Sequence, residues 1–419
     1  MDVRPRRLEP ITREALASFR VVVVTGPRQA GKTTLVRRTL GGAGTFAPLD
    51  HEATLQAALT DPTGFAMFGE TPRAFDEIQR GGDPLIRAIK RVVDDDWSPG
   101  QFLLNGSADF LTVPTISESL AGRATFLELW PFTQGEIHGD SDGFLDQAFT
   151  DPALLPVGSS PPVEQSGYLE RICTGGFPEV VSLAGRPRRS WFRDYVRTVT
   201  QRDIVELTGA RRSRHLDKLL SLLAARTACE LVMTKVHAAA DLGSPTTTDD
   251  YVAHLEMSYL VRLLPAWSRN LTRKITRRPK VHITDTGLAA HLLGKTPEAL
   301  ARPTDPARGQ LLESFVFNEL LRQTTWAEDE IRLYHLRDRD GAEIDFIAEA
   351  TDGRFVAIEV KSAAAVNPSD TRWLKWLRKK ASDDFVCGVV LHTGSRAYRL
   401  GDRLLALPVS FLWTSGEGG

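Results

Sequence analysis

Residues 21–34 read Val-Val-Val-Val-Thr-Gly-Pro-Arg-Gln-Ala-Gly-Lys-Thr-Thr. The valines predict a buried strand, and the Gly-x-x-x-x-Gly-Lys-Thr pattern after them is typical of a phosphate-binding P-loop. We expect Lys32 to reach the β- and γ-phosphates of ATP and Thr33 to bind Mg²⁺, with a helix beginning at Lys32. The expected nucleotide-binding residues are Gly26, Pro27, Arg28, Gln29, Ala30, Gly31, Lys32, Thr33 and Thr34.

Two acidic residues follow the apolar pair Ala74-Phe75. We expect Asp76 to hold Mg²⁺ through water and Glu77 to act as the general base on the attacking water. A solvated Asp-Glu pair at a helix start is the alternative. The segment before Asp76, Thr71-Pro-Arg-Ala-Phe, is less apolar than an ordinary buried strand.

Two further polar residues are candidates for catalysis. Asn105 ends the apolar run Phe102-Leu-Leu and could hold the attacking water, although a plain turn would also explain it. Arg123 is a candidate phosphate-sensing arginine, acting in cis or across a subunit boundary, or else a surface arginine.

Length and composition limit the class of protein. At 419 residues the chain is long enough for two to four domains, and its net charge of −1 gives no overall attraction for nucleic acid. The three cysteines, Cys173, Cys229 and Cys387, are too far apart for a CxxC pair, which fits a reducing cytoplasm. Neither a signal sequence nor a membrane span is recognisable, so we expect a cytoplasmic protein.

The pattern of apolar residues predicts an α/β fold with several parts. Strand candidates at 21–25, 74–75 (leading into Asp76), 102–104 and 125–129 alternate with helical patterns, as in a parallel sheet. We expect a nucleotide-binding core over 1–165 and a basic helical lid over 166–226. Helix, turn, helix and a two-stranded hairpin predict a winged helix over 227–300, and a small α/β domain is expected over 309–419.

The last of these segments carries a candidate metal site. Strand alternation would bring Asp345, Glu359 and Lys361 together at one sheet edge, and Glu313 could join them from an apolar helix face, with Glu319 as a rival. Such residues suit a magnesium nuclease, and a salt-bridged pair of strands is the alternative.

Basic residues without any acid between them fill the stretch from 269 to 280. On a wing they would contact the phosphate backbone in a salt-sensitive, sequence-independent way, unless the hairpin is simply solvated. The expected DNA-binding residues are Arg269, Arg273, Lys274, Arg277, Arg278 and Lys280.

Taken together, the motifs resemble a widespread prokaryotic family of AAA-type ATP-binding proteins. They are Gly26–Thr34, Phe75-Asp-Glu-Ile-Gln79, Gly106-Ser-Ala, Ser119-Leu-Ala-Gly-Arg123, Gly175-Gly-Phe-Pro-Glu179, Arg202-Asp-Ile, Asp285-Thr-Gly-Leu, Glu313-Ser-Phe-Val, Glu343-Ile-Asp-Phe and Ile358-Glu-Val-Lys-Ser362. The resemblance implies an AAA-type P-loop NTPase with a winged helix, a C-terminal PD-(D/E)xK nuclease-like α/β domain of unknown function, and a homo-oligomer. Asn105 departs from the family, where a threonine is more frequent.

The sequence thus predicts an ATPase that binds Mg²⁺ and ATP and is stimulated by DNA. It would grip or remodel duplex, single-stranded or branched DNA, and its nuclease-like domain would either cut or bind. The alternative is a regulatory ATP switch whose C-terminal domain docks protein partners without DNA chemistry.

Overall fold

The computed structural model describes residues 4–106, 120–153, 155, 163–200, 213–242, 244–268, 278–338 and 341–414. Contacts divide the chain into two compact units, Met1–Pro131 with Met257–Tyr259 and Phe132–Glu256 with Leu260–Gly419. Among the described residues, no helix combines the length and the apolar character that crossing a bilayer requires. All three cysteines are free thiols.

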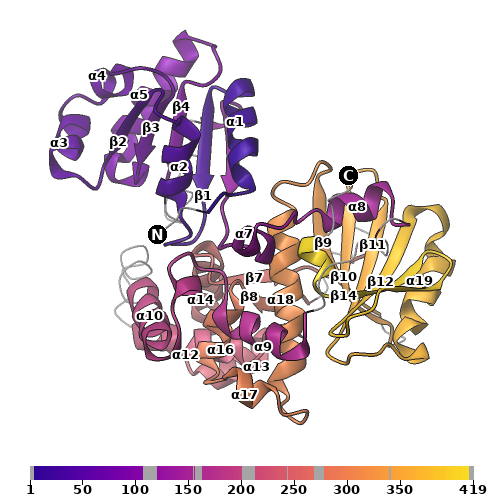
Figure 1. The fold of residues 1–419 in the computed structure, drawn as a ribbon. Coiled ribbons are helices and arrows are strands. Elements are labelled where there is room, and N and C mark those ends of the chain that lie inside the picture. Colours follow the sequence, from indigo (N-terminus) through magenta and orange to yellow (C-terminus); the bar gives the residue numbers. More distant parts are fainter. Residues whose placement is uncertain are drawn as a thin grey trace. The chain divides into compact units, whose positions relative to one another are not determined.

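The first unit is a five-stranded parallel sheet between two layers of helices (Figure 1). Its strands, in the order β2-β3-β4-β1-β5, are β1 (Val21–Thr25), β2 (Thr45–Pro48), β3 (Arg73–Asp76), β4 (Phe102–Asn105) and β5 (Ala124–Glu128). Its helices are α1 (Leu8–Ser18), α2 (Lys32–Leu40), α3 (Glu52–Thr60), α4 (Pro62–Met67), the 3-10 turn η1 (Ile78–Gly81) and α5 (Gly82–Asp95). The parallel α/β sheet expected from the sequence is confirmed.

The valines of β1 are all buried because the sheet is covered on both faces. Val22 and Val24 pack into a core with residues of α1 and α2, whereas Val21 and Val23 join a core with residues of α5. This alternation follows from the two-residue period of a strand. Strand β1 is therefore fixed from both sides, which holds the loop after it in place.

The second unit begins with a helical region and a small antiparallel sheet. The helices are α7 (Gln134–His138), α8 (Phe144–Thr150), α9 (Gln165–Thr174), η4 (Val180–Ser182), α10 (Gly185–Thr198), α12 (Ser213–Ala224), α13 (Met233–Ala240), α14 (Pro245–Met257), α16 (Thr286–Leu292) and α17 (Pro297–Leu300). The sheet has the order β6-β8-β7, with β6 (Cys229–Glu230), β7 (Val261–Leu264) and β8 (Lys280–Ile283).

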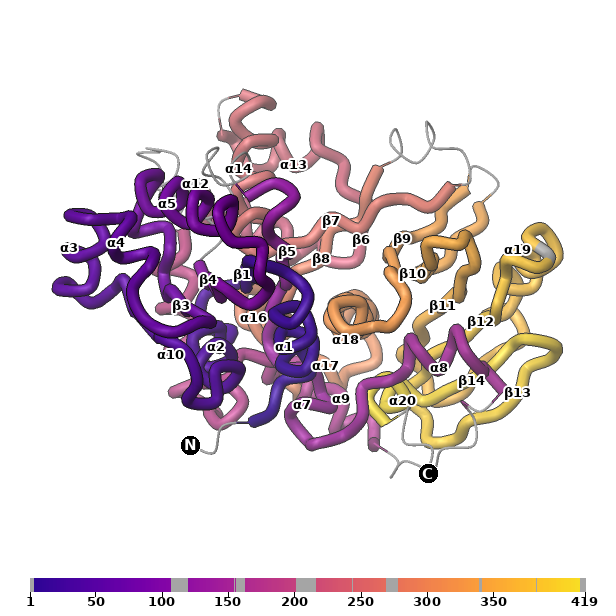
Figure 2. The backbone as a smooth tube through the Cα atoms, turned by 90° about the horizontal axis from the view of Figure 1, so that it is seen from above, coloured from indigo at the N-terminus to yellow at the C-terminus, as the bar shows by residue number. Residues whose placement is uncertain are grey.

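A six-stranded mixed sheet forms the C-terminal part of the second unit. It has the order β13-β14-β12-β11-β10-β9, with β9 (Ile331–Arg337), β10 (Glu343–Ala350), β11 (Phe355–Lys361), β12 (Phe385–His392), β13 (Tyr398–Gly401) and β14 (Leu404–Pro408). Helix α18 (Ala307–Gln323) packs on one face and α19 (Arg372–Ala381) on the other (Figure 2). Shorter elements are η6 (Pro368–Thr371), η7 (Ser382–Asp384) and α20 (Phe411–Thr414).

Candidate functional site

The P-loop joins β1 to α2 through three residues with positive φ angles: Gly26 (142°), Gln29 (60°) and Gly31 (97°). At Gly26 a Cβ atom would collide with the carbonyl oxygen of Leu129, so only glycine fits there. Within the described residues, no side chain caps the N-terminus of α2, where Gly31 is the N-cap residue. The first backbone N–H groups of α2 are thus available to an anion.

The Lys32 side chain lies inside the curl of this loop and is buried. Its amine donates hydrogen bonds of 3.0 Å to the carbonyl oxygens of Gly26 and Pro27. Arg6 supports the loop from outside, because its guanidinium donates to the carbonyl oxygens of Ala30, at 2.7 Å, and Trp130. This role could not be predicted from the sequence, since Arg6 is one of several N-terminal arginines that suggest only a charged surface.

A hydrogen bond joins the P-loop helix to the strand that carries the acids. Thr33 Oγ1 donates to Asp76 Oδ1 at 3.2 Å, and Asp76 is the last residue of β3 and is 5% exposed. Burial raises the pKa of Asp76, while hydrogen bonds with the Thr33 and Asn105 side chains counteract this rise in part. A divalent cation would favour the ionised form of such a buried carboxyl, so Thr33 and Asp76 fit a Mg²⁺ site.

Glu77 and Asn105 lie next to Asp76 because β4 stands between β1 and β3 in the sheet. Glu77 has a left-handed backbone (φ 54°), and its N–H donates to Asn105 Oδ1 at 3.3 Å. The Glu77 carboxylate in turn accepts a hydrogen bond from Gln79 Nε2. The structure thus brings together Lys32, Thr33, Asp76, Glu77 and Asn105 at the carboxyl ends of three parallel strands, as expected.

Arg123 lies at the amino ends of these strands, whereas the P-loop follows the carboxyl end of β1. Arg123 directly precedes β5, whose first residue, Ala124, pairs with Val21 at the start of β1. Its guanidinium forms a two-pronged ion pair with Asp94 at the C-terminal end of α5. The interpretation that Arg123 senses phosphate in cis is wrong for this arrangement, because the length of β1 separates it from the P-loop of its own chain.

The expected C-terminal residues also lie together. Asp345 is on β10, Glu359 and Lys361 are on β11, and Glu313 is on α18. Asp345 Oδ2 accepts a 2.9 Å hydrogen bond from the Val360 N–H, and Lys361 Nζ donates to Glu359 Oε1 at 2.7 Å. The first of these bonds fixes the Asp345 carboxylate beside β11.

An unexpected lysine occupies the middle of this group. Lys280 Nζ lies 2.7 Å from Glu313 Oε1, 3.4 Å from Asp345 Oδ1 and 3.6 Å from Glu343 Oε1. Its side chain is only 2% exposed. The prediction that Lys280 contacts DNA is therefore wrong: β8 carries it into the interior, where carboxylates neutralise it. We call Lys280, Glu313, Glu343, Asp345, Glu359 and Lys361 the carboxylate–lysine cluster.

Electrostatics within the cluster are strongly perturbed. Burial, followed by repulsion from Asp345, raises the pKa of both Glu313 and Glu359 to about 8. Burial alone would lower the pKa of Lys280, but Glu313 and Asp345 outweigh it and raise that pKa. Among the described residues, no group of three or more His, Cys, Asp or Glu side chains is arranged to hold a metal ion. The Lys280 ammonium instead lies within 3.6 Å of Glu313, Glu343 and Asp345, so a catalytic metal does not fit the cluster as it stands.

Glu319, the rival of Glu313, belongs to a different network. It is fully buried, accepts a 3.0 Å hydrogen bond from the Gln134 N–H and pairs with Arg322 at 3.2 Å. Burial raises its pKa to about 7. In the same network Asp285 accepts a 2.7 Å hydrogen bond from the Gly176 N–H, and a Cβ atom at Gly175 would collide with the Asp285 carboxylate. The Gly175-Gly and Asp285-Thr-Gly motifs are therefore explained by this close contact between the two segments.

Of the remaining expected DNA-binding residues, four cannot be placed. Arg269, Arg273, Lys274 and Arg277 lie outside the described residues, between β7 and β8 in the sequence. Arg278 is exposed, and its carbonyl oxygen contacts His335 Nε2 at 3.1 Å. Arg278 is thus the one member of the basic stretch that the described part of the chain presents to solvent.

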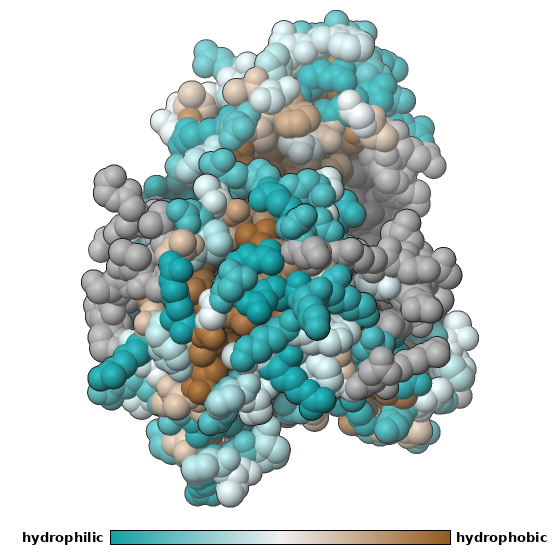
Figure 3. Space-filling model, turned by 90° about the vertical axis from the view of Figure 1, so that its right-hand side faces the viewer, coloured by the Kyte–Doolittle hydropathy of each residue, from teal (hydrophilic) through white to brown (hydrophobic). Residues whose placement is uncertain are grey.

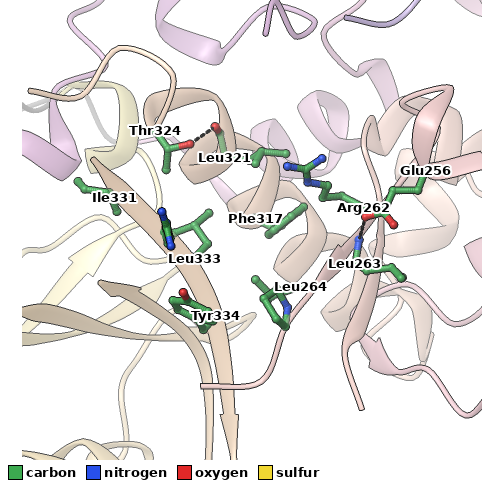
Figure 4. A pocket seen from close by; sticks show the side chains of 12 residues that line it. Glu256, Arg262, Leu263, Leu264, Phe317, Leu321, Thr324, Ile331, Leu333 and Tyr334 are labelled. Carbon is green, nitrogen blue, oxygen red and sulfur yellow. Dashed lines mark hydrogen bonds between the residues drawn. The ribbon is translucent and has the colours of Figure 1, made fainter. Parts of the chain in front are cut away.

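A cavity of about 500 Å³ opens between β7 and β9 (Figure 4). Leu264, Phe317 and Leu333 line it, together with Glu256 and Arg262. None of the residues expected to bind ATP, metal or DNA is among its lining residues. On the face drawn in Figure 3, hydrophobic surface forms a narrow strip between hydrophilic side chains. Neither feature identifies a ligand.

Comparison with known proteins divides the chain into three matched segments. Residues 18–138 match the family described as AAA domain. Residues 165–299 and 308–412 match the families described as domain of unknown function DUF8612 and DUF4143. Residues 18–138 are therefore an AAA-type P-loop ATPase domain, and the expectation of that class is confirmed.

Two relatives span nearly the whole chain. The uncharacterized proteins Rv2008c of Mycobacterium tuberculosis and Mb2031c of Mycobacterium bovis are each 29% identical over 411 residues, covering 97% of this chain and 83% of the relative. The solved Walker-type ATPase PABY2304 of Pyrococcus abyssi is 16% identical and covers 70% of this chain and 96% of its own, with a TM-score of 0.41.

Proposed function

We propose that the protein hydrolyses Mg²⁺-bound ATP at the P-loop, with Glu77 as the general base. The observation that carries this proposal is the hydrogen bond from Thr33 to Asp76, at 3.2 Å. This bond places the Thr33 hydroxyl of α2 and the buried Asp76 carboxylate of β3 side by side, where both could bind one Mg²⁺ ion. The adjacent Glu77 and Asn105 supply a base and an amide at the same sheet edge.

Each residue has a separate task in the reaction. Lys32 and the N-terminal N–H groups of α2 neutralise charge on the phosphates, and Asn105 orients Glu77 and the attacking water. Glu77 accepts the proton of that water as its oxygen bonds to the γ-phosphorus and the bond to the oxygen of ADP breaks. Bound Mg²⁺, held by Thr33 and Asp76, would offset the charge of the β- and γ-phosphates.

The test compares Glu77→Gln with the wild-type protein. The variant keeps the size of the side chain but cannot accept a proton, so turnover should fall by roughly 10²-fold or more. Its affinity for a fluorescent ATP analogue should stay close to that of the wild type. Glu70→Gln is the matched control, because it makes the same substitution at an exposed carboxylate between α4 and β3. Wild-type turnover in Glu77→Gln would show that another acid is the base.

A second candidate function is contact with DNA. Helices α12, α13 and α14 are followed by the antiparallel strands β7 and β8, with β6 completing the sheet, and this order supports a winged helix. In that fold the basic stretch between β7 and β8 would be the wing. Helix α14 contains no lysine or arginine, and its Asp249 and Asp250 are exposed.

Acidic side chains on α14 disfavour its insertion into the major groove, because they would face the phosphates. Any DNA contact is therefore assigned to the basic stretch between β7 and β8 in the sequence, which would bind the phosphate backbone without reading bases. The rival remains a regulatory ATP switch that docks a protein. Fluorescence polarisation with duplex, single-stranded and branched DNA at two salt concentrations separates the two: the switch would bind none of these substrates in a salt-dependent way.

The C-terminal sheet is nuclease-like in fold, and the protein assembles as a homo-oligomer. The first statement is supported by Asp345, Glu359 and Lys361 on adjacent antiparallel strands beside α18. The second is supported by the match to the AAA domain family, and Arg123, which lies away from the P-loop of its own chain, could then act on that of another subunit. Analytical ultracentrifugation with and without ATP tests the second statement, and a single monomeric species in both conditions would refute it.

A further inference from the structure

The carboxylate–lysine cluster draws its members from four elements. Strand β8 supplies Lys280, α18 supplies Glu313, and β10 and β11 supply the remaining acids. The Lys280 amine is the cation that these carboxylates share, at 2.7 Å from Glu313, 3.4 Å from Asp345 and 3.6 Å from Glu343. A residue of the small three-stranded sheet thus neutralises an acidic group of the six-stranded sheet.

A divalent metal needs the oxygens that this amine already holds. Mg²⁺ in proteins takes about six oxygen ligands at roughly 2.0–2.1 Å. Asp345 uses Oδ1 toward Lys280 and Oδ2 toward the Val360 N–H, while Glu359 uses Oε1 toward Lys361. Among the described residues, the buried Glu359 Oε2 has no hydrogen-bond partner. A metal shared by Glu313, Glu343 and Asp345 would still have to take the place of the ammonium that these three carboxylates face.

The ammonium cannot readily make room for a metal. Its side chain is 2% exposed, and β8 is the central strand of its sheet, paired with β6 and β7. A metal on the same oxygens would lie within a few ångströms of a positive charge that has no path to solvent.

We propose that Lys280 is the resident cation of this cluster, so that the C-terminal domain binds no catalytic divalent metal and cuts no DNA. The cluster instead fixes β8, and with it the end of the basic stretch, to α18 and β10. This inference concerns the C-terminal domain and is independent of ATP hydrolysis at the P-loop.

Thermal unfolding of the full-length protein, without nucleotide, tests the proposal with Mn²⁺ as the probe. Lys280→Met removes the charge at nearly constant volume. Mn²⁺ should raise the unfolding temperature of this variant, since a ligand that binds only the folded state stabilises it. In the wild type, any effect of Mn²⁺ should come from the Thr33–Asp76 site and should therefore remain in Asp345→Asn. Lys361→Met is the matched control, because it removes a lysine whose side chain is 31% exposed and which contacts Glu359 rather than Glu313 or Asp345. Its response to Mn²⁺ should be no larger than that of the wild type.

The response must also depend on Asp345. In Lys280→Met combined with Asp345→Asn the effect of Mn²⁺ should disappear, which assigns the metal to the cluster and not to the P-loop. The proposal is overturned if the wild type gains stability with Mn²⁺ and Asp345→Asn alone abolishes the gain. It is equally overturned if folded Lys280→Met shows no gain. Should Lys280→Met fail to fold, the wild-type and Asp345→Asn titrations decide, and absence of an Asp345-dependent response upholds the proposal.

Discussion

Thr33 and Asp76 stand 43 residues apart in the chain, yet Thr33 Oγ1 donates a hydrogen bond to Asp76 Oδ1 at 3.2 Å. The contact arises because β1 and β3 are parallel strands whose carboxyl ends meet at the same edge of the sheet. One residue offers a hydroxyl oxygen and the other a buried carboxylate, which are ligand types that Mg²⁺ prefers. The metal-binding side of the site is therefore organised by the sheet itself.

Asp76→Asn should raise the requirement for Mg²⁺ without preventing nucleotide binding. The amide oxygen of asparagine can still accept the hydrogen bond from Thr33, but the negative charge is lost. Loss of such an outer-shell ligand costs roughly 10- to 100-fold in metal affinity, so half-maximal ATPase activity should need correspondingly more Mg²⁺. Activity measured across a Mg²⁺ series checks this. Asp50→Asn, which alters an exposed carboxylate that acts on Asp76 only through its charge, should leave the curve in place.

Arg123→Ala should leave the ATPase rate of dilute, dissociated protein unchanged. The reason is that Arg123 lies beside the amino end of β1, away from the P-loop at its carboxyl end, and pairs with Asp94. At concentrations where subunits associate, the rate of the wild type should exceed that of the variant if Arg123 completes the site of a neighbour. Specific activity measured over a dilution series distinguishes these regimes. Asp94→Asn frees Arg123 and serves as the control for the lost ion pair. A large loss of activity in dilute Arg123→Ala would contradict the geometry.

Stability should fall as pH rises through neutrality, and Glu359 should be one cause. Its carboxyl has a pKa raised by burial and by Asp345 from 4.5 to about 8 in the folded chain. The folded state therefore retains a proton that the unfolded state has already released between these values. The stabilisation is complete below pH 4.5 and is lost as pH rises through 8, with a slope of at most about 1.4 kcal/mol per pH unit for one proton.

Glu359→Gln should remove that contribution. Urea unfolding at several pH values between 5 and 8 should show a flatter decline of the unfolding free energy in the variant than in the wild type. Equal slopes in the two proteins would mean that Glu359 is ionised in the folded state throughout this range.

The sequence predicted the parallel strands around the P-loop because their signals are local. Val21–Thr25 is apolar enough to be a strand, the glycines after it mark the loop, and Asp76 and Asn105 each end a short apolar run. Parallel strands then bring the three ends together. Strand β2 was missed because Thr45–Pro48 is short, only half-buried and ends in proline.

The position of Lys280 could not be predicted from its neighbours in sequence. It follows several basic residues, which suggests a solvated surface, yet β8 is the central strand of its sheet. Its partners Glu313, Glu343 and Asp345 lie more than 30 residues further along the chain. Arg6 was missed for the same reason, because its acceptors, the Ala30 and Trp130 carbonyl oxygens, come from distant loops. A charged residue in a basic run can be assigned to the surface only when its tertiary neighbours are known.

DNA affinity should fall when charge is removed from the segment between β7 and β8. Arg273→Ala with Lys274→Ala removes two cations, and each lost phosphate contact lowers the salt slope by about one, so the slope should flatten by up to about two units. Fluorescence polarisation over a salt series measures both quantities, and ATP affinity should not change. Arg186→Ala with Arg189→Ala is the matched control, since both residues are exposed on α10 and carry the same total charge. If the two double variants lose affinity equally, binding reflects net charge alone; if neither changes the slope, this segment does not contact DNA.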